Sequence, residues 1–299
     1  MNTPRTLGRH QVSALGLGGM LLSIEGRPDR DRAKATITAA IANGITLIDT
    51  ADAYHSFADD RGHNEILIAE VLRELGSAAA DVVVATKGGK VRPGDGSWPS
   101  DARPEHLIAS AKLSAARLGV DSIALYQLHA PDPAVPFIES LEALRELVTQ
   151  GVVEDVGVSN VSATEVGIAA RVLGSSFVSV QNQFSPSRTE YRDVLDLCTD
   201  TGLAFLAWRP LGAVLSQWDS TNTAETFGAV AAAHEVSVHQ VILAWELSLS
   251  PAIIPIPGST RPETAVDSAG AMGLELTESE RLLLATYGTV PNGTVPARP

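Results

Sequence analysis

The chain has 299 residues, of which 44% are hydrophobic and 19% charged, so it can bury a sizeable core and is not disordered. Asp and Glu outnumber Lys and Arg by 35 to 22, which gives a net charge of −13. That field repels phosphate backbones and anionic membranes, so neither nucleic acid nor a membrane is an expected partner. A small anionic cofactor held by a few local cations remains compatible with it.

Cysteine usage and the N-terminal residues bear on the compartment. The single cysteine, Cys198, excludes an internal disulfide framework and is typical of a reducing compartment. The N-terminus has no apolar signal region, and the most apolar stretch, 241–256, is interrupted by Glu246, Pro251 and Pro255. We therefore expect a cytoplasmic protein, and the absence of an apolar stripe favours a monomer or a weak homo-oligomer.

Short apolar, β-branched runs alternate with amphipathic segments along the chain. The runs predict strands at 15–18, 45–49, 82–87, 123–128, 153–158, 177–181, 204–208 and 253–256. The segments predict helices at 64–70, 104–118, 140–147, 163–172, 194–199, 224–233, 240–247 and 262–271. Pro104 and Pro262 suit first-turn positions, and Ser162 or Thr164 suits an N-cap.

Continuous apolar strands that alternate with helices indicate a parallel sheet covered on its outer face. Eight such units favour a closed barrel over an open sheet, and no linker or low-complexity tract divides the chain. The sequence therefore predicts one α/β domain over residues 1–299, a (β/α)8 TIM barrel with its active site at the C-terminal ends of the strands.

Four groups that can carry protons or charge follow three successive strands. Taken singly, Asp49 suits a helix cap, Tyr54 a rim aromatic, Lys87 a solvated amine and His129 a hydrogen-bonded loop residue. Together they converge on one barrel mouth. No His, Cys and carboxylate cluster with metal-ligand spacing is present, so no metal site is expected.

These four groups suit proton supply to a carbonyl oxygen that receives a hydride. A tyrosine with an unperturbed pKa of about 10 is a suitable acid if an ammonium stabilises its phenolate. Lys87 can supply that cation, Asp49 can hold Lys87, and an N–H of His129 can orient the carbonyl.

Several motifs then identify a resemblance. In order and spacing, the chain is similar to the aldo-keto reductase superfamily in LIDTADAY at 47–54, GHNE at 62–65, ATK at 85–87, LYQLH at 125–129 and GVSN at 157–160. The match runs from Leu7 to the tail near Glu278. It implies a (β/α)8 barrel that uses NADPH, with NADH as the other possibility, to reduce a small-molecule carbonyl substrate. It also implies a catalytic tetrad of Tyr54, Lys87, His129 and Asp49.

Cofactor contacts are implied by the same resemblance. It assigns Ser159, Asn160 and Gln181 to the nicotinamide carboxamide and Trp208 to stacking on its ring, where ordinary core packing is the alternative for Trp208. Close approach to the cofactor at the first strand end explains Gly18, Gly19 and Met20. Pro210, Leu211 and Gly212 are assigned to the pyrophosphate, and Pro257, Gly258, Ser259 and Arg261 to the adenosine phosphate. The other assigned cofactor contacts are Asp49, Asp267 and Ser268.

The sequence departs from the family pattern at a few of these positions. Gly258 and Thr264 stand where well-known members carry Lys and Arg, so Arg261 is the candidate cation for a 2′-phosphate. Ser268 replaces an adenine-contacting Asn or Gln. Arg209 follows the stacking aromatic and could bind pyrophosphate, hold an anionic substrate or form a buried ion pair.

The substrate pocket depends on the loops after Tyr54, after Lys87 and around Trp218. For the loop at 91–98, a pocket wall containing Trp98 is favoured over a plain solvated loop.

Two further functions stay open. One is an NADPH-sensing module with little turnover. The other is a different (β/α)-barrel enzyme, a lyase or isomerase with Lys87 as a Schiff-base amine.

Overall fold

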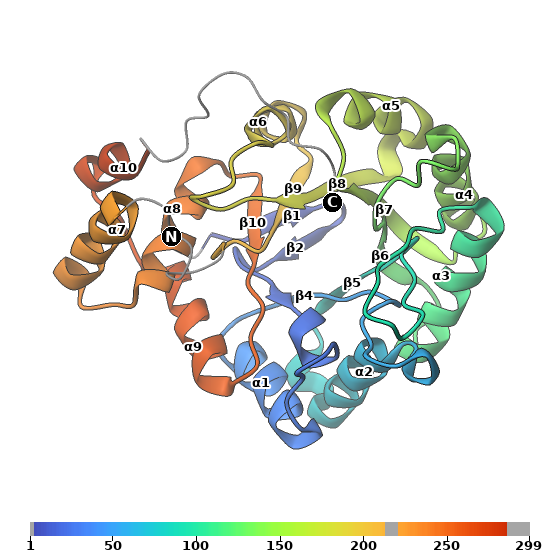
Figure 1. The fold of residues 1–299 in the computed structure, drawn as a ribbon, viewed down its shortest axis with the longest axis horizontal. Helices are drawn as coiled ribbons and strands as arrows, with labels where there is room; N and C mark the ends of the chain where they lie inside the picture. Colours follow the sequence, from blue (N-terminus) through green and yellow to red (C-terminus); the bar gives the residue numbers. More distant parts are fainter. Residues whose placement is uncertain (1–2, 213–220, 286–299) are drawn as a thin grey trace.

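Eight parallel strands follow one another around a barrel in chain order, with helices on the outside (Figure 1). The structure is a computed structural model that describes residues 3–212 and 221–285, so Trp218 lies outside the described residues. The strands are β3 (Leu17–Gly18), β4 (Leu47–Asp49), β5 (Val83–Gly88), β6 (Ile123–Leu128), β7 (Val153–Ser159), β8 (Phe177–Gln183), β9 (Ala204–Trp208) and β10 (Ile253–Ile256). All eight predicted strands and the predicted fold class are confirmed.

The barrel closes between its first and last strands. Gly16 N donates to Pro255 O at 2.9 Å and Gly18 N donates to Pro257 O at 3.0 Å, so β3 lies against β10. A Cβ atom on Gly18 would lie 2.8 Å from the carbonyl oxygen of Ile256. Glycine is therefore required at this seam by a close approach of two backbones.

The helices cover the outer face of the barrel. They are α1 (Arg30–Ala42), α2 (His63–Leu75), α3 (Pro104–Leu118), α4 (Phe137–Thr149), α5 (Ala163–Leu173), α6 (Arg192–Thr201), α7 (Thr221–His234), α8 (Val238–Leu249), α9 (Pro262–Gly270) and α10 (Glu278–Ala285). The predicted first-turn prolines begin α3 and α9. Ser162, rather than Thr164, caps α5, where it and Glu165 form a reciprocal capping box.

The sequence did not predict α1. Its buried positions are Ala33, Thr36, Ile37 and Ala40, so small side chains replace the large apolar stripe that marks a helix. Asp29 caps its first turn by accepting a hydrogen bond from Arg32 N at 2.9 Å.

An antiparallel hairpin, β1 (Arg5–Leu7) and β2 (His10–Val12), precedes the barrel. Leu7 and Val12 are buried in the same cluster as inward side chains of the strands, including Leu125, Leu206 and Ile254. The hairpin therefore seals the apolar interior at the amino ends of the strands and leaves the carboxyl ends for polar side chains.

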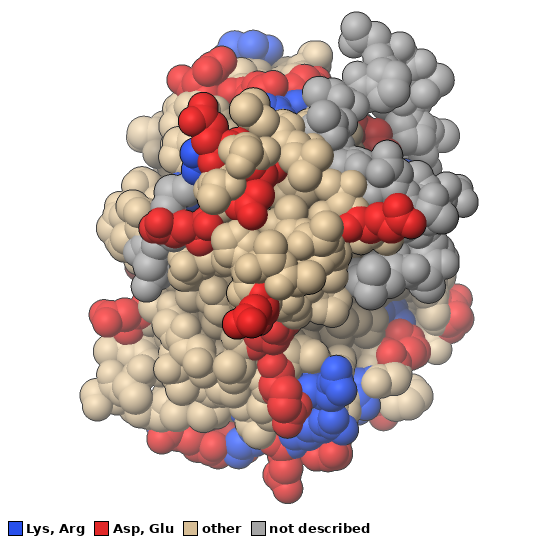
Figure 2. All heavy atoms as spheres, turned by 90° about the vertical axis from the view of Figure 1, so that its left-hand side faces the viewer, with Lys and Arg blue, Asp and Glu red and all other residues tan. Residues whose placement is uncertain are grey.

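The surface reflects the composition. Acidic side chains are spread over the face in Figure 2, whereas Lys and Arg gather mainly near its lower edge.

Within the described ranges, no single helix is long and apolar enough to cross a membrane. The pair α7 and α8, bent by 99°, meets that length and composition test only when the two helices are taken together. No group of three or more His, Cys, Asp or Glu side chains in the described residues could hold a metal ion.

Candidate active site

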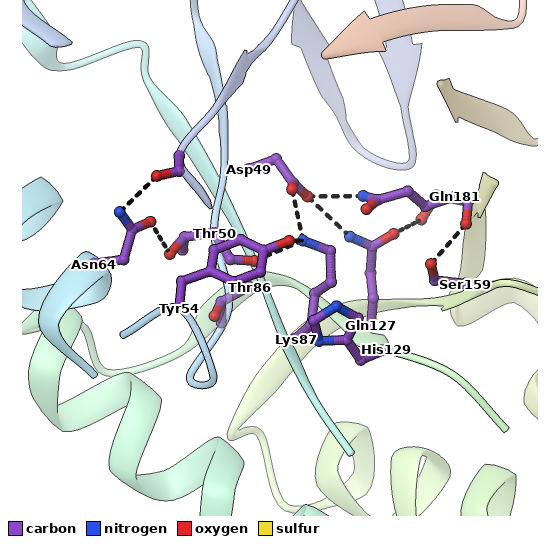
Figure 3. A network of polar contacts seen from close by, with 12 residues as sticks. Asp49, Thr50, Tyr54, Asn64, Thr86, Lys87, Gln127, His129, Ser159 and Gln181 are labelled. Atoms are coloured by element: carbon purple, nitrogen blue, oxygen red, sulfur yellow. Dashed lines mark hydrogen bonds and ion pairs between the residues drawn. The ribbon is translucent and has the colours of Figure 1, made fainter. Parts of the chain in front are cut away.

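A buried ion pair lies at the carboxyl end of the barrel (Figure 3). Lys87 Nζ is 2.5 Å from Asp49 Oδ2 and donates to the carbonyl oxygen of Thr50 at 2.8 Å. The third partner of the ammonium is the hydroxyl of Tyr54, at 3.1 Å. The Lys87 side chain is completely buried and Asp49 nearly so. Parallel pairing places β4 and β5 side by side, which is why residues 38 positions apart in the sequence meet here.

Asp49 is held on its other oxygen as well. Gln181 Nε2 donates to Asp49 Oδ1 at 2.7 Å and Gln127 Nε2 does so at 3.4 Å. Both glutamines are buried and come from β8 and β6, across the interior of the barrel. The carboxylate therefore has partners on both oxygens, which fixes its orientation toward Lys87.

Opposing effects set the pKa values of Tyr54 and Lys87. Burial raises the pKa of Tyr54 above its usual value, and the charge of Lys87 acts against that rise. Burial alone would lower the pKa of Lys87, but Asp49 and Tyr54 raise it above the usual value. Lys87 is thus a charged ammonium beside a protonated tyrosine. A Schiff-base role, which needs an accessible neutral amine, does not fit this environment.

His129 follows β6 and faces the tyrosine. Its ring centre is 5.7 Å from that of Tyr54, with the planes at 83°. Burial, followed by the charges of Lys87 and Lys90, holds the pKa of His129 well below its usual range, so the imidazole is neutral. Nδ1 is buried with no hydrogen-bond partner in the described residues. An unfilled acceptor costs less than an unfilled donor here, which favours the proton on Nε2.

Asn64, at the start of α2, joins the loops around the tyrosine. Its Oδ1 accepts from Thr50 Oγ1 at 2.6 Å, and its Nδ2 donates to Gly19 O at 2.8 Å and Ser23 Oγ at 2.7 Å. Asn64 is completely buried. The same residue therefore fixes Thr50, whose carbonyl holds Lys87, and the loop after β3.

The predicted carboxamide-binding residues lie next to one another. Ser159 Oγ donates to Gln181 O at 2.6 Å, and Asn160 Nδ2 donates to His129 O at 2.9 Å and Ser159 Oγ at 3.0 Å. Asn160 has a φ of +59°, a left-handed conformation in which asparagine is among the least strained side chains. These contacts bring Ser159, Asn160 and Gln181 together beside His129, and their cofactor role stays a prediction.

Trp208 ends β9 and is half-buried, with an indole Nε1 that is buried and has no acceptor in the described part of the chain. Arg209 is exposed, has a φ of +52° and lies 6.0 Å from the Trp208 ring centre. The suggested buried ion pair for Arg209 is therefore wrong. Pro210 and Leu211 follow in a tight turn that Gly212 closes, with Gly212 N donating to Arg209 O at 2.8 Å.

Gly19, which follows β3, makes room for a neighbouring side chain. A Cβ atom on Gly19 would lie 2.4 Å from Asn64 Oδ1, so its missing side chain makes room for that amide. Met20 begins a short 3-10 helix, Met20–Leu22. The predicted approach of Gly18, Gly19 and Met20 to a cofactor stays a prediction.

The predicted phosphate segment leads into α9. Pro257 and Ser259 are buried and Gly258 is exposed, beside the barrel seam. Arg261 is an exposed N-cap residue with no side-chain capping bond, so its guanidinium is available at a helix N-terminus. Ser268 is buried, and the Asp267 carboxylate already accepts from Ser237 Oγ at 2.7 Å and Gln240 Nε2 at 2.8 Å.

Trp98, on the loop after β5, lies beside the tetrad. Its ring centre is 6.2 Å from that of Tyr54 and 6.5 Å from that of His129. Thr50, Asn64 and Gln127 support the site, although the sequence analysis named all three only as parts of motifs. Their roles depend on contacts between strands and loops, and the GHNE and LYQLH motifs do not reveal those contacts.

Comparisons with known proteins identify the family of the chain. The family model for the aldo/keto reductase family matches residues 14–283. The chain is 31% identical over 284 residues to pyridoxine 4-dehydrogenase of Escherichia coli (strain K12), covering 91% of this chain and 94% of that protein.

Solved structures are similar as well. A thermostable aldo-keto reductase, Tm1743, solved with the inhibitor epalrestat, has a TM-score of 0.82 and 29% identity, covering 95% of this chain and 99% of its own. An aldo/keto reductase from Klebsiella pneumoniae, solved with NADP and acetate, has a TM-score of 0.81 and 24% identity, with 98% of each chain covered. The chain belongs to the aldo/keto reductase family.

Proposed function

We propose that the chain is an NADPH-dependent oxidoreductase that reduces an aldehyde or ketone to an alcohol, with Tyr54 as the proton donor. The observation that carries the proposal is the completely buried Lys87 ammonium between Asp49 and the Tyr54 hydroxyl. A buried cation at 3.1 Å from a phenol stabilises the phenolate that remains after proton transfer.

The residues present suit NADPH. The amides and hydroxyl of Ser159, Asn160 and Gln181 offer polar atoms for a carboxamide, and the half-buried indole of Trp208 offers a flat apolar surface. Arg261 offers a free guanidinium at the N-terminus of α9 for a phosphate. When bound, NADPH supplies the hydride.

In the proposed mechanism, Tyr54 and His129 orient the substrate carbonyl. The neutral imidazole donates a hydrogen bond from its Nε2–H to the carbonyl oxygen, where negative charge develops, and keeps its proton. Tyr54 transfers its hydroxyl proton to that oxygen, and Lys87 stabilises the resulting phenolate. Asp49 holds the ammonium in position and, with both oxygens already bonded, takes no proton itself.

The test is NADPH consumption by the purified protein with 4-nitrobenzaldehyde and, from the named relative, pyridoxal. We expect turnover of at least one, with NADPH preferred over NADH. Arg261→Met is expected to lower kcat/KM for NADPH by about tenfold and to leave that for NADH within about twofold, since one charge-assisted hydrogen bond contributes ~1.5 kcal/mol. NADPH binding seen as tryptophan fluorescence quenching, with no turnover of any carbonyl tested, would favour the sensing module instead.

A further inference from the structure

Arg92 is a buried cation that the proposed mechanism does not use. It lies on the loop between β5 and α3, and its side chain is 0% exposed. Nη2 pairs with the carboxylate of Glu25, which is 55% exposed. Nε and Nη1 are buried and find no hydrogen-bond acceptor among the described residues.

The guanidinium lies one ring away from the catalytic groups. Its central carbon is 4.1 Å from the ring centre of Trp98, which is the stacking distance for a cation on an indole. The rings of Tyr54 and His129 also lie near that indole, with centres at 6.2 and 6.5 Å. Trp98 therefore separates Arg92 from the place where the substrate carbonyl would sit.

The unfilled donors indicate a missing partner. A buried donor without an acceptor gives up its hydrogen bond to water without replacement, so two on one guanidinium call for an explanation. Glu25 compensates the charge only in part, because more than half of its side chain is in water. A carboxylate is the group that supplies strong acceptors and the opposite charge together.

The covering loop is held mainly at its two ends. Val91 N donates to Pro99 O at 2.9 Å and Asp101 N donates to Gly89 O at 3.0 Å, whereas residues 93–97 between them are exposed. Lys90, a second cation here, donates from Nζ to Trp98 O at 3.2 Å. A small movement of the indole would open Arg92 toward the tetrad without breaking the bonds at the base of the loop.

We propose that Arg92 determines substrate specificity by binding a carboxylate at the far end of an aldehyde or ketone, with Trp98 moving off the guanidinium as the substrate enters. The substrate class is then an oxo acid whose carbonyl is reduced while its carboxylate pairs with Arg92. This inference rests on the proposed carbonyl reduction.

The experiment compares two aldehydes that differ in one charge, 4-carboxybenzaldehyde and its methyl ester. The wild type is expected to show a kcat/KM about tenfold higher for the carboxylate. Arg92→Met is expected to lower kcat/KM for the carboxylate by about 10- to 100-fold and that for the ester by less than about threefold, as one charge-assisted contact is worth 1.4–2.8 kcal/mol. Arg103→Met, which removes an exposed guanidinium from the start of α3, should change neither.

A second variant keeps the test decisive if Arg92→Met does not fold. Glu25→Gln removes the competing carboxylate, so kcat/KM for 4-carboxybenzaldehyde should rise by about threefold while that for the ester stays constant. Equal losses for both aldehydes in Arg92→Met would show a role in holding Trp98 only, and would overturn the inference. Turnover of the ester with no preference for the carboxylate would overturn it too while leaving the proposed function intact. No turnover of either aldehyde would count against both.

Discussion

Two buried carboxyl groups in this barrel have opposite surroundings. Asp49, at the carboxyl end of β4, has partners on both oxygens: Lys87 on one, Gln181 and Gln127 on the other. Glu246, within α8, is completely buried, and neither oxygen has a partner in the described residues. Burial raises the pKa of Glu246 well above its usual value.

The difference shows what a barrel mouth provides. Side chains from several strands converge at the carboxyl ends, so a charge buried there can be fully paired. The helix interior provides no such convergence, so burial of Glu246 favours the protonated form of its carboxyl. The pairing of Asp49 offsets the cost of its burial, whereas the unpaired burial of Glu246 costs stability.

The largest expected effect comes from removing Lys87. Lys87→Met should lower kcat by about 10²–10⁴-fold, the usual contribution of general acid catalysis, because the phenolate of Tyr54 loses its cation. It should also lower the free energy of unfolding by about 3–5 kcal/mol, since Asp49 is left as an uncompensated buried charge. Steady-state kinetics and urea denaturation measure the two effects.

The double variant Lys87→Met/Asp49→Asn separates the loss of activity from the loss of stability. It should recover most of the lost stability, because no buried charge remains, and none of the lost activity. Recovery of activity together with stability would mean that Lys87 acts only as a structural counter-ion.

An intermediate effect is expected at Asn64, which positions the ion pair without touching it. Asn64→Leu removes three buried hydrogen bonds and should lower kcat by about tenfold, ~1.4 kcal/mol, with a smaller change in KM. Displacing Lys87 weakens the attraction that opposes the raised pKa of Tyr54. The alkaline loss of reduction, which needs protonated Tyr54, should therefore move to higher pH.

Two milder variants form a matched pair for this prediction. Thr50→Val and Ser23→Ala each remove one hydroxyl that bonds to Asn64, at 2.6 and 2.7 Å. Only Thr50 leads to Lys87, through its backbone carbonyl. The pH profile should shift in Thr50→Val and stay fixed in Ser23→Ala; equal shifts would reduce Asn64 to a general packing role.

The smallest effect concerns stability at Glu246. Glu246→Leu should raise the free energy of unfolding at pH 8 by about 1–3 kcal/mol, the cost of burying a polar group without partners. Because the pKa is raised in the folded state, wild-type stability falls as the pH rises above the unfolded value of about 4.3. The gain should therefore be smaller at pH 4, where only the cost of burying the neutral carboxyl without partners remains.

Thermal denaturation at the two pH values measures this gain. Glu142→Leu on α4, which removes an exposed carboxylate, is the control and should show no such pH dependence. A gain at pH 4 equal to that at pH 8 would show that Glu246 is not a buried protonated carboxyl.

Much of the fold was predictable because parallel strands buried on both faces are continuous apolar runs. Helix α1 was not, since two alanines and a threonine make up its buried face together with Ile37. The tetrad could be predicted from polar residues at strand ends and from the family motifs. Arg92 could not, because its contact with Glu25 joins loops 67 residues apart, and only side-chain placement reveals the unfilled donors beside Trp98.

The most direct test of the account is the Tyr54→Phe variant, which removes one hydroxyl from the buried Asp49–Lys87–Tyr54 set. NADPH consumption with an activated aromatic aldehyde should fall by about 10²–10⁴-fold, while NADPH still quenches tryptophan fluorescence with unchanged affinity. Turnover near the wild-type rate would contradict the assignment of Tyr54 as the proton donor.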